Sequence, residues 1–437
     1  MQISDSQSKK NARVLIITYY WPPSAGSGVQ RWLKFAKYLP EFGWDPVIFT
    51  PENPDFELKD ETLLSEISAQ TEVLKFPIWE PYNLFRKLKR EKAGDTSKVL
   101  EKSKRSLMDK FGIWLRANAI IPDPRVFWVK PSVNFLLDLV NSGQFQAIIT
   151  TGPPHSLHLI GLQLHQKHKI PWLADFRDPW SKWEFLDTLP MTSWARRKHE
   201  KLEKKVLSKA TAISTISPIF QSEMEALSNR KVDLLTNGFD EDDLPDDWTK
   251  RIPSSSSFEI VYTGVIDAIR NPIPFLEAMK SSLAHNKGNV MLRFVGKVSD
   301  GVKTYIQADD WLSAHVKLEG YVSHEKVFDF YGQAHLLLLI LTDTKNAKGN
   351  IPGKLFEYMA TGKPIIALGD PDGDAAGILQ KANAGKVYAH SDMEGIRKFL
   401  RDFEPEVNHT PSPEIQQYSR KNLTKQLAMI LDRISDK

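Results

Sequence analysis

The residues of this chain best suited to bind a phosphate group lie together in one short block near residue 350. Residues 349–366 read GNIPGKLFEYMATGKPII, which predicts a Gly/Pro loop, then an amphipathic helix, then an apolar strand. Gly353 and Lys354 stand at the start of this helix, where unpaired backbone N–H groups, the helix dipole and an ammonium group all favour a bound anion. Glu357 follows one turn later and can accept hydrogen bonds from sugar hydroxyls. The block therefore predicts a site for a phosphate or diphosphate.

This block is close to a nucleotide-binding P-loop, but it departs from that motif at two positions. Lys348 occupies the place of the first glycine, and Leu355 replaces the Ser or Thr that would hold magnesium. We therefore expect a diphosphate site of another kind.

Length and composition indicate a globular protein with more than one domain. The chain has 437 residues, of which 41% are hydrophobic and 26% charged, so about two or three domains are expected. The absence of cysteine excludes disulfides, thiolate metal sites and cysteine nucleophiles. The first residues are polar and the longest apolar run, 336–341, is too short to span a bilayer, so we expect a cytoplasmic protein. A net charge of +4 does not call for nucleic acid, and we expect no such partner.

Two similar halves, each alternating short apolar runs with helical segments, predict two α/β domains. The first half contains strand-like runs at 13–18, 45–50, 147–150, 172–175, 212–216 and 231–235. The second half contains such runs at 258–264, 291–296, 335–341 and 364–368. This alternation is typical of parallel βαβ units. We expect two tandem Rossmann-like, doubly wound parallel sheets, with a ligand cleft between their carboxyl strand ends.

A polar, Pro/Ser-rich stretch after residue 237 separates the two halves and sets the expected domain boundaries. We expect an N-terminal domain over 1–245 and a C-terminal domain over 246–411. The amphipathic segment 412–437 is expected to form a helix that crosses back to the first domain.

An insertion at 83–130 interrupts the first βαβ series and combines a basic segment with an aromatic one. Between Arg86 and Lys110 there are ten Lys/Arg against four Asp/Glu, and an apolar segment with Trp114 and Ile120 follows. Such a combination can lie on an anionic membrane surface. The alternative is a solvated, partly helical insertion with a core-facing end.

Two loops of the first half offer residues for a ligand. Gly26 and Gly28 precede a helix, where small residues let a phosphate approach the backbone, but Arg31 at the third glycine position excludes a dinucleotide fingerprint. Arg177 and Asp178 follow an apolar strand, and α/β sheets place ligand groups at strand ends. The alternatives are an ordinary strand–helix connection and a structural salt bridge.

Three further features complete the candidate set. His155 ends a Gly-Pro-Pro-His turn and is a candidate acid/base, although a lone loop histidine is more often only hydrogen-bonded. Arg270 follows the strand that ends at Gly264 and, with Lys354, could neutralise a leaving diphosphate; the alternative is a surface arginine. The carboxylates within 370–374 could bind a divalent cation, but Gly and Pro there favour an ordinary loop, so we expect no metal.

The combined motifs resemble the retaining glycosyltransferases of the GT-B type, family 4, the bacterial group 1 type, over nearly the whole chain. The block at 349–366 carries the specific part of this likeness. The supporting segments are Pro22-Pro23 with Gly26-Ser-Gly28, Asn237-Gly-Phe-Asp240, Tyr262-Thr-Gly264, Phe294-Val-Gly296 and Leu318-Glu-Gly-Tyr-Val322. The resemblance implies a two-domain GT-B fold that binds a nucleotide-sugar donor mainly on the C-terminal domain.

The resemblance also implies roles for individual residues. Glu357 corresponds to the second Glu of the family's E-x7-E motif and would hold the ribose hydroxyls, while Arg270 and Lys354 would hold the diphosphate. The loop Gly26–Gly28 would close over the diphosphate from the other domain, and the backbone near Tyr321 would border the base. The remaining donor-binding positions are Gly264, Gly296, Val322, Gly353 and Leu355. Such enzymes generally need no metal for catalysis, and we expect no cofactor.

Two departures from the family pattern concern the donor sugar and the catalytic residues. Gly349 stands eight residues before Glu357, where many relatives carry the first Glu, so the contacts to the donor sugar are not assigned. The family's frequent active-site histidine is replaced, with Arg177 or Asp178 in its neighbourhood. We therefore expect stabilisation of the leaving group by the two cations, and positioning, to carry catalysis, with His155 as a further candidate.

The sequence as a whole predicts a glycosyltransferase that moves a sugar, with retention, from a nucleotide-diphosphate donor to an acceptor hydroxyl in surface-polysaccharide or glycolipid assembly. The acceptor would be a lipid-linked molecule or an oligosaccharide, and a peripheral contact with the anionic inner face of the cell membrane is one expectation. Two alternatives are a nucleotide-sugar epimerase of the same fold and a non-catalytic nucleotide-sugar-binding subunit. The sequence specifies neither the donor base, the sugar nor the acceptor.

Overall fold

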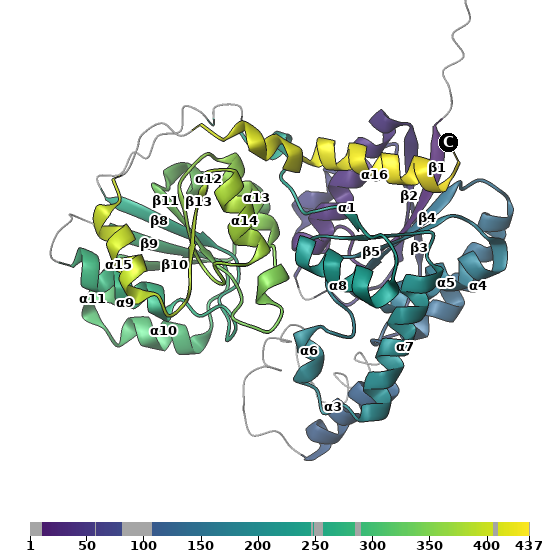
Figure 1. Ribbon diagram of the computed structural model, residues 1–437, viewed down its shortest axis with the longest axis horizontal. Helices are drawn as coiled ribbons and strands as arrows, with labels where there is room; N and C mark the ends of the chain where they lie inside the picture. The colour runs from purple at the N-terminus through teal and green to yellow at the C-terminus, as the bar shows by residue number, and fades with distance from the viewer. Residues whose placement is uncertain are drawn as a thin grey trace, which may run out of the picture.

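Two α/β domains lie side by side in the computed structural model, which describes residues 11–56, 58–80, 107–245, 248, 257–284, 290–404 and 410–436 (Figure 1). The N-terminal sheet has seven strands in the order β3-β2-β1-β4-β5-β6-β7, and the C-terminal sheet has six in the order β10-β9-β8-β11-β12-β13. Neighbouring strands are parallel throughout both sheets. Each order reverses beside the first strand of its sheet, which is the doubly wound pattern. The predicted fold class is confirmed.

The N-terminal domain alternates strands and helices along the chain. Its strands are β1 (Ala12–Ile17), β2 (Trp44–Pro51), β3 (Glu72–Phe76), β4 (Ala147–Gly152), β5 (Trp172–Phe176), β6 (Ala212–Thr215) and β7 (Asp233–Leu234). Its helices are α1 (Ser27–Tyr38), α3 (Leu107–Ala119), α4 (Val126–Asn141), α5 (Ser156–His168), α6 (Glu184–Asp187), α7 (Ser193–Lys209) and α8 (Pro218–Ser228).

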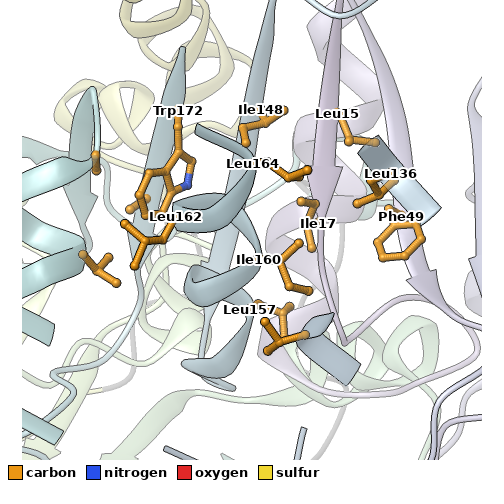
Figure 2. Close-up of a cluster of buried hydrophobic side chains, with 14 of the residues drawn as sticks. Leu15, Ile17, Phe49, Leu136, Ile148, Leu157, Ile160, Leu162, Leu164 and Trp172 are labelled. Carbon is orange, nitrogen blue, oxygen red and sulfur yellow. The ribbon is translucent and has the colours of Figure 1, made fainter. Parts of the chain in front are cut away.

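The core of this domain forms because apolar faces of helices cover both faces of the sheet. On one face, Ile160 and Leu164 of α5 pack with Leu15 and Ile17 of β1 and with Ile148 of β4, all of them buried (Figure 2). The spacing of the two α5 residues, four apart, places them on one side of the helix. The opposite face of the sheet packs against α1 and the C-terminal helix.

The C-terminal domain repeats this arrangement. Its strands are β8 (Phe258–Thr263), β9 (Val290–Val295), β10 (Val316–Gly320), β11 (Leu336–Ile340), β12 (Ile365–Leu368) and β13 (Gly385–Tyr388). Its helices are α9 (Ile273–Leu283), α10 (Asp300–Gln307), α11 (Asp310–His315), α12 (His324–Gln333), α13 (Gly353–Ala360), α14 (Asp374–Lys381) and α15 (Met393–Asp402). The central strand β11 reads LLLLI and is buried at every residue, because helices cover both of its faces.

The last helix, α16 (Arg420–Ile434), lies against α1 of the N-terminal domain (Figure 1). The chain leads into it beside an earlier crossing segment: the Phe239 N–H donates to the Tyr418 carbonyl at 3.2 Å, and the Arg420 N–H donates to the Phe239 carbonyl at 2.7 Å. Leu423 and Leu427 then enter the core formed by α1 and the first sheet. Two crossing segments therefore pair with each other where the domains meet.

Three details differ from the sequence expectations. The helix predicted over 412–437 is divided. The Ser419 hydroxyl accepts a hydrogen bond from the Asn422 N–H and starts α16 there, after a 3-10 turn over Pro413–Tyr418. The last residues of the predicted insertion form the first turn of α4, where Trp128 is buried in the core. The edge strands β3, β10 and β13 were not predicted.

Residues 86–106, which are most of the basic segment of the predicted insertion, lie outside the described residues. Among the helices that are described, none has the length and apolar character needed to cross a membrane.

We expect α16 to hold the N-terminal domain together as well as to connect it. Leu427 is fully buried in the core against α1, so Leu427→Ala should lower the free energy of unfolding by about 2 to 5 kcal/mol through lost burial and a residual cavity. Met429 lies on the same helix and is 63% exposed, so Met429→Ala is the matched control and should be nearly neutral. Equal stabilities of the two variants in denaturant titrations would show that α16 is only loosely attached.

Candidate functional site

A cavity of about 640 Å³ lies between the two domains. Its walls include residues that follow the carboxyl ends of strands in both sheets, such as Arg177 after β5, Gly264 after β8 and Tyr321 after β10. Because parallel strands end at the same edge of a sheet, this is where doubly wound domains place ligand groups. Ten of the predicted site residues line this cavity: Gly26, Arg177, Asp178, Gly264, Arg270, Tyr321, Val322, Gly353, Lys354 and Glu357.

Lys354 is the cation at the centre of this wall. It lies in the first turn of α13, after the Ile351-Pro352 segment, and its Nζ donates to the Thr263 carbonyl at 2.6 Å. The same nitrogen lies 3.8 Å from the centre of the Tyr262 ring. Among the described residues it forms no ion pair with a carboxylate. Burial, reinforced by the positive charge of Arg270, holds the pKa of Lys354 well below its ordinary value.

Two glycines make the close approach of this lysine possible. Gly264 has a φ of +115°, and a Cβ there would lie 3.2 Å from the Lys354 Nζ. Gly296 has a φ of +136° and does not line the cavity, but a Cβ there would overlap the Gly264 carbonyl. Both positions therefore need a residue without a side chain, one for the lysine and one for the loop beside it.

Arg270 provides the second cation, and a neighbouring carboxylate holds it in place. Its Nη1 donates to Asp267 Oδ2 at 2.7 Å, and its backbone N–H donates to Asp267 Oδ1 at 3.1 Å. Half-buried Arg270 and Lys354 are close enough for the charge of one to act on the other. Two cations and the N-terminal end of α13 therefore converge on one part of the cavity, which is the arrangement expected for an anion with more than one negative charge.

Glu357, one turn along α13 from Lys354, is held by two side chains of α12. It accepts a hydrogen bond from the Tyr331 hydroxyl at 3.0 Å, and its Oε1 lies 3.3 Å from the His324 Nε2. Burial acts to raise the pKa of Glu357, but the hydrogen bond and charge of His324 outweigh it and lower that pKa. For His324 the effect of burial is the reverse and lowers the pKa. The hydrogen bond and charge of Glu357 more than offset it and raise the pKa of His324 to about 9. The two side chains form an ion pair at neutral pH.

The wall from the N-terminal domain contains Arg177 and Asp178 at the end of β5. The Arg177 Nη2 donates to the Pro153 carbonyl at 2.5 Å. A Cβ at Gly28 would overlap this guanidinium, so the glycine lets Arg177 lie against the start of α1, although Gly28 itself does not line the cavity. Burial raises the pKa of Asp178, although the positive charge of Arg177 opposes the shift.

Two other predicted residues lie away from the cavity. His155 is buried beneath its wall, with its ring stacked on Trp180 at 5.1 Å between ring centres. Burial is the main reason, and the positive charge of neighbouring residues a smaller one, that the pKa of His155 lies well below its ordinary value. The ring is therefore neutral. Leu355 is fully buried in the core of the C-terminal domain. Neither side chain can touch a ligand in this arrangement.

The structure gives a physical reason for the glycine at position 349. Gly349 is buried, and a Cβ there would overlap the Phe220 ring, which reaches it from α8 of the other domain. A glutamate at this position would need Phe220 to move. Close by, Asn350 Nδ2 donates to Thr342 Oγ1 at 3.0 Å, and both residues line the cavity. They are polar groups that sequence reasoning missed: Thr342 belongs to no motif, and Asn350, although it lies in the block 349–366, was given no role there.

A second group of missed residues links the two domains across the cavity. The Glu184 N–H donates to Asn346 Oδ1 at 3.0 Å, and the Thr344 hydroxyl donates to Glu184 Oε1 at 3.2 Å. Asp374, in the loop that was considered for a metal, accepts a hydrogen bond from the Ile219 N–H at 2.9 Å. Across the described ranges, no three His, Asp or Glu side chains are grouped so as to hold a metal ion.

Comparison with known proteins agrees with this geometry. Residues 257–403, which include Lys354, Arg270 and Glu357, match the family model for glycosyl transferases group 1. No curated protein sequence matches the chain.

Three solved structures show the same fold over nearly the whole chain. Sucrose-phosphate synthase from Thermosynechococcus elongatus has 15% identity and a TM-score of 0.66, with 97% of this chain and 99% of that chain covered. HepE from Anabaena, solved in complex with UDP, has 14% identity and a TM-score of 0.63, with 97% and 100% covered. WaaG, a glycosyltransferase involved in lipopolysaccharide biosynthesis, has 12% identity and a TM-score of 0.54, with 97% and 100% covered. These likenesses establish the GT-B fold.

The ion pair between His324 and Glu357 should make the stability of the empty protein depend on pH. The pKa of His324 is raised from 6.5 to about 9, so its contribution is complete below pH 6.5 and is lost as the pH rises through 9. Because the pKa of Glu357 is lowered, its contribution to the stability of the protein is complete above pH 4.5 and is lost at lower pH. The difference in Tm between the wild type and His324→Gln should therefore be largest between about pH 5 and 6.5 and should disappear by about pH 10.

Thermal denaturation of both proteins across this pH range measures the effect. A difference in Tm that stays constant from pH 6 to pH 10 would show that His324 contributes by packing and not by charge.

Proposed function

We propose that this protein is a glycosyltransferase that moves a sugar from a nucleotide-diphosphate donor to an acceptor hydroxyl. The observation that carries this proposal is the convergence of Lys354, Arg270 and the start of α13 in the cavity between the domains. Glu357 lies one turn further along the same helix. The match of this domain to the group 1 glycosyltransferase model supports the same assignment.

In this proposal the two cations bind the donor diphosphate and Glu357 accepts hydrogen bonds from the ribose. When the bond between the sugar and the diphosphate breaks, negative charge grows on the leaving oxygen, and Lys354 and Arg270 stabilise it in a site already formed for it. The acceptor hydroxyl forms the new bond to the sugar and loses its proton. Asp178 lines the N-terminal wall, and burial raises its pKa, which makes this carboxylate a stronger base, so we assign it the role of proton acceptor.

The finer assignments follow from the resemblance to family 4. They are retention of configuration at the transferred carbon, and a place in surface-polysaccharide or glycolipid assembly. A UDP-sugar is the first donor to test, because HepE was solved in complex with UDP. Retention is tested by the anomeric configuration of the product.

Transfer fits the cavity better than epimerisation. An epimerase of this fold needs convergent acid and base groups at the sugar, whereas His155 is buried outside the cavity and His324 is paired with Glu357. The glycine at position 349, where many relatives carry a Glu, is the observation that favours the third candidate, a non-catalytic binding subunit. The Phe220 ring gives that glycine a packing role, so its presence no longer argues against catalysis.

Incubation with UDP-, GDP- and dTDP-sugars separates these functions. Transfer predicts release of nucleoside diphosphate that increases when the acceptor is added. Conversion of the donor into its epimer without such release would identify an epimerase. Binding without turnover across lipid-linked and oligosaccharide acceptors would identify a binding subunit.

Removal of either cation should impair the reaction strongly. We expect Lys354→Ala and Arg270→Ala each to lower kcat/KM by about 100-fold or more, since a contact that stabilises transition-state charge contributes about 3 kcal/mol. Lys348→Ala is the matched control, because Lys348 is an exposed cation of the preceding loop, 3.7 Å from an Asp370 carboxylate oxygen. Near-normal turnover in both Lys354 and Arg270 variants would remove these residues from the reaction.

We further propose that the protein docks on anionic membranes through α3 and α7, which would bring it to a lipid-linked acceptor. Phe111 and Trp114 of α3 are 63% and 42% exposed, and Trp194 at the start of α7 is 56% exposed. An apolar groove runs between α3 and the loop at 188–190. Asn118 fixes the two together: it donates to the Pro190 carbonyl at 2.9 Å and accepts from the Thr192 N–H at 2.7 Å.

The outer face of α7 adds positive charge beside these aromatic side chains. Ala195, Val206 and Leu207 are buried against the domain. The opposite side exposes the cations Arg197, Lys198, Lys201, Lys204 and Lys205 against one exposed acid, Glu200. Figure 1 shows α3 and the first part of α7 at the end of the N-terminal domain remote from α16. Exposed aromatic rings next to several cations suit the interface of an anionic bilayer.

Removal of part of this charge should weaken membrane binding without changing the reaction. Each lysine near an anionic surface contributes up to about 1 kcal/mol, so the triple variant Lys201→Gln, Lys204→Gln, Lys205→Gln should reduce binding to phosphatidylglycerol vesicles by about tenfold or more. Turnover of a soluble acceptor analogue should be unchanged.

The matched control carries the same loss of charge on the C-terminal domain, at the exposed residues Lys317, Lys386 and Lys398. Vesicle co-sedimentation at low and raised salt measures binding. Failure of the wild type to sediment with anionic vesicles at low salt, or equal loss in both triple variants, would contradict a specific docking face. The basic residues of the segment 86–106, including Lys87, Lys89, Arg90, Lys104 and Arg105, lie outside the described residues.

A further inference from the structure

Arg420, the first residue of α16, lines the cavity between the domains although it comes from the C-terminal crossing segment. Its side chain is buried, with the residue 5% exposed, and its Nη1 has no hydrogen-bond partner among the described residues. The backbone of this residue is fixed, because its N–H donates to the Phe239 carbonyl at 2.7 Å and its carbonyl accepts from the Thr424 hydroxyl at 2.7 Å. A buried guanidinium with an unsatisfied donor costs free energy, and such a group in a native protein calls for a partner.

The carboxylates near Arg420 are already paired with other residues. The charges that act on Arg420 are those of Arg31, Glu357, Asp240 and Asp243. Asp240 and Asp243 lie 2.9 and 2.5 Å from Lys34 Nζ, and Glu357 is paired with His324. Each acid therefore has a partner without Arg420, so Arg420 is not needed to neutralise any of them.

The position of Arg420 relative to Glu357 indicates which part of a ligand it can reach. The charges of Arg270, Glu357 and Asp267 act on Lys354. Those of Arg31, Glu357, Asp240 and Asp243 act on Arg420. The charge of Glu357 thus acts on both cations, whereas that of Arg270 acts on Lys354, and all four residues line the cavity. If Lys354 marks the diphosphate and Glu357 the ribose, Arg420 lies on the nucleoside side.

We propose that Arg420 is a nucleoside-binding residue, whose unpaired guanidinium donates hydrogen bonds to oxygen atoms of the ribose or base of the donor. This inference rests on the proposed function, since it assumes a nucleotide in the cavity. It also means that the C-terminal crossing segment, and not the C-terminal domain alone, forms part of the donor site. A planar group with several N–H donors is well suited to neighbouring oxygen acceptors.

Binding measurements on Arg420→Met test the assignment, because methionine keeps an unbranched apolar side chain and removes the charge and the donors. Calorimetry with UDP, GDP and dTDP first identifies the nucleotide that binds the wild type. For that nucleotide we expect Arg420→Met to weaken binding at least tenfold. The affinity for the corresponding nucleoside, measured by competition with the nucleotide, should fall by a similar factor. The affinity for pyrophosphate, measured in the same way, should change less than twofold. In Lys354→Ala, by contrast, the affinity for pyrophosphate should fall and the affinity for the nucleoside should change little.

The neighbouring residue offers a matched control. Lys421 is exposed on the same helix and forms a surface ion pair with Glu41 at 2.6 Å, so Lys421→Met should leave nucleotide affinity within twofold of the wild type. Arg420→Lys, which keeps the charge but loses the planar fork, should also weaken nucleoside competition and gives a second test if the methionine variant does not fold.

Thermal stability separates ligand binding from a structural role. Because the neighbouring acids keep their own partners, empty Arg420→Met should have a Tm equal to or above that of the wild type, while the shift in Tm caused by the nucleotide should shrink. A lower Tm of the empty variant with unchanged nucleotide affinity would overturn the inference and make Arg420 structural. If none of the three nucleotides binds the wild type, the proposed function fails first, and this inference fails with it.

Discussion

The ammonium group of Lys354 is held between the Thr263 carbonyl and the face of the Tyr262 ring, in a half-buried position where it has no carboxylate partner among the described residues. Burial and the nearby Arg270 lower the pKa of Lys354, so the empty site holds this charge at a cost. A bound diphosphate would remove that cost by supplying the missing negative charge. Gly264 lies beside the lysine and Gly296 lies against Gly264. Both have a positive φ and no side chain, which allows the lysine to approach. Geometry of the loop, burial of the lysine and affinity for an anion are thus linked.

The second constraint is that the site belongs to both domains. Phe220 of the N-terminal domain packs on Gly349, and Glu184 is hydrogen-bonded to Thr344 and Asn346 of the C-terminal domain. The two crossing segments pair at Phe239 and Ser419, directly before Arg420. Any change in the angle between the domains would alter these contacts. Binding of a ligand in the cavity and the relative position of the domains are therefore coupled by direct contacts.

Much of this fold could be predicted from the sequence, because its central strands are continuous apolar runs such as Leu336–Ile340. The strands that were missed, β3, β10 and β13, all lie at sheet edges, where one side is exposed and charged residues interrupt the apolar pattern. In the site, Lys354 and Glu357 were accessible to prediction since they lie one helical turn apart in one segment. His324, Glu184 and Arg420 were not, because only folding brings them to the cavity from distant parts of the chain.

A crystal structure of the protein with its nucleoside diphosphate would test the central claim most directly. The account predicts electron density for the diphosphate at the start of α13, within hydrogen-bonding distance of Lys354 Nζ and the Arg270 guanidinium, and density for the ribose at the Glu357 carboxylate. Density for the nucleotide elsewhere, with Lys354 still bonded only to the Thr263 carbonyl, would contradict it.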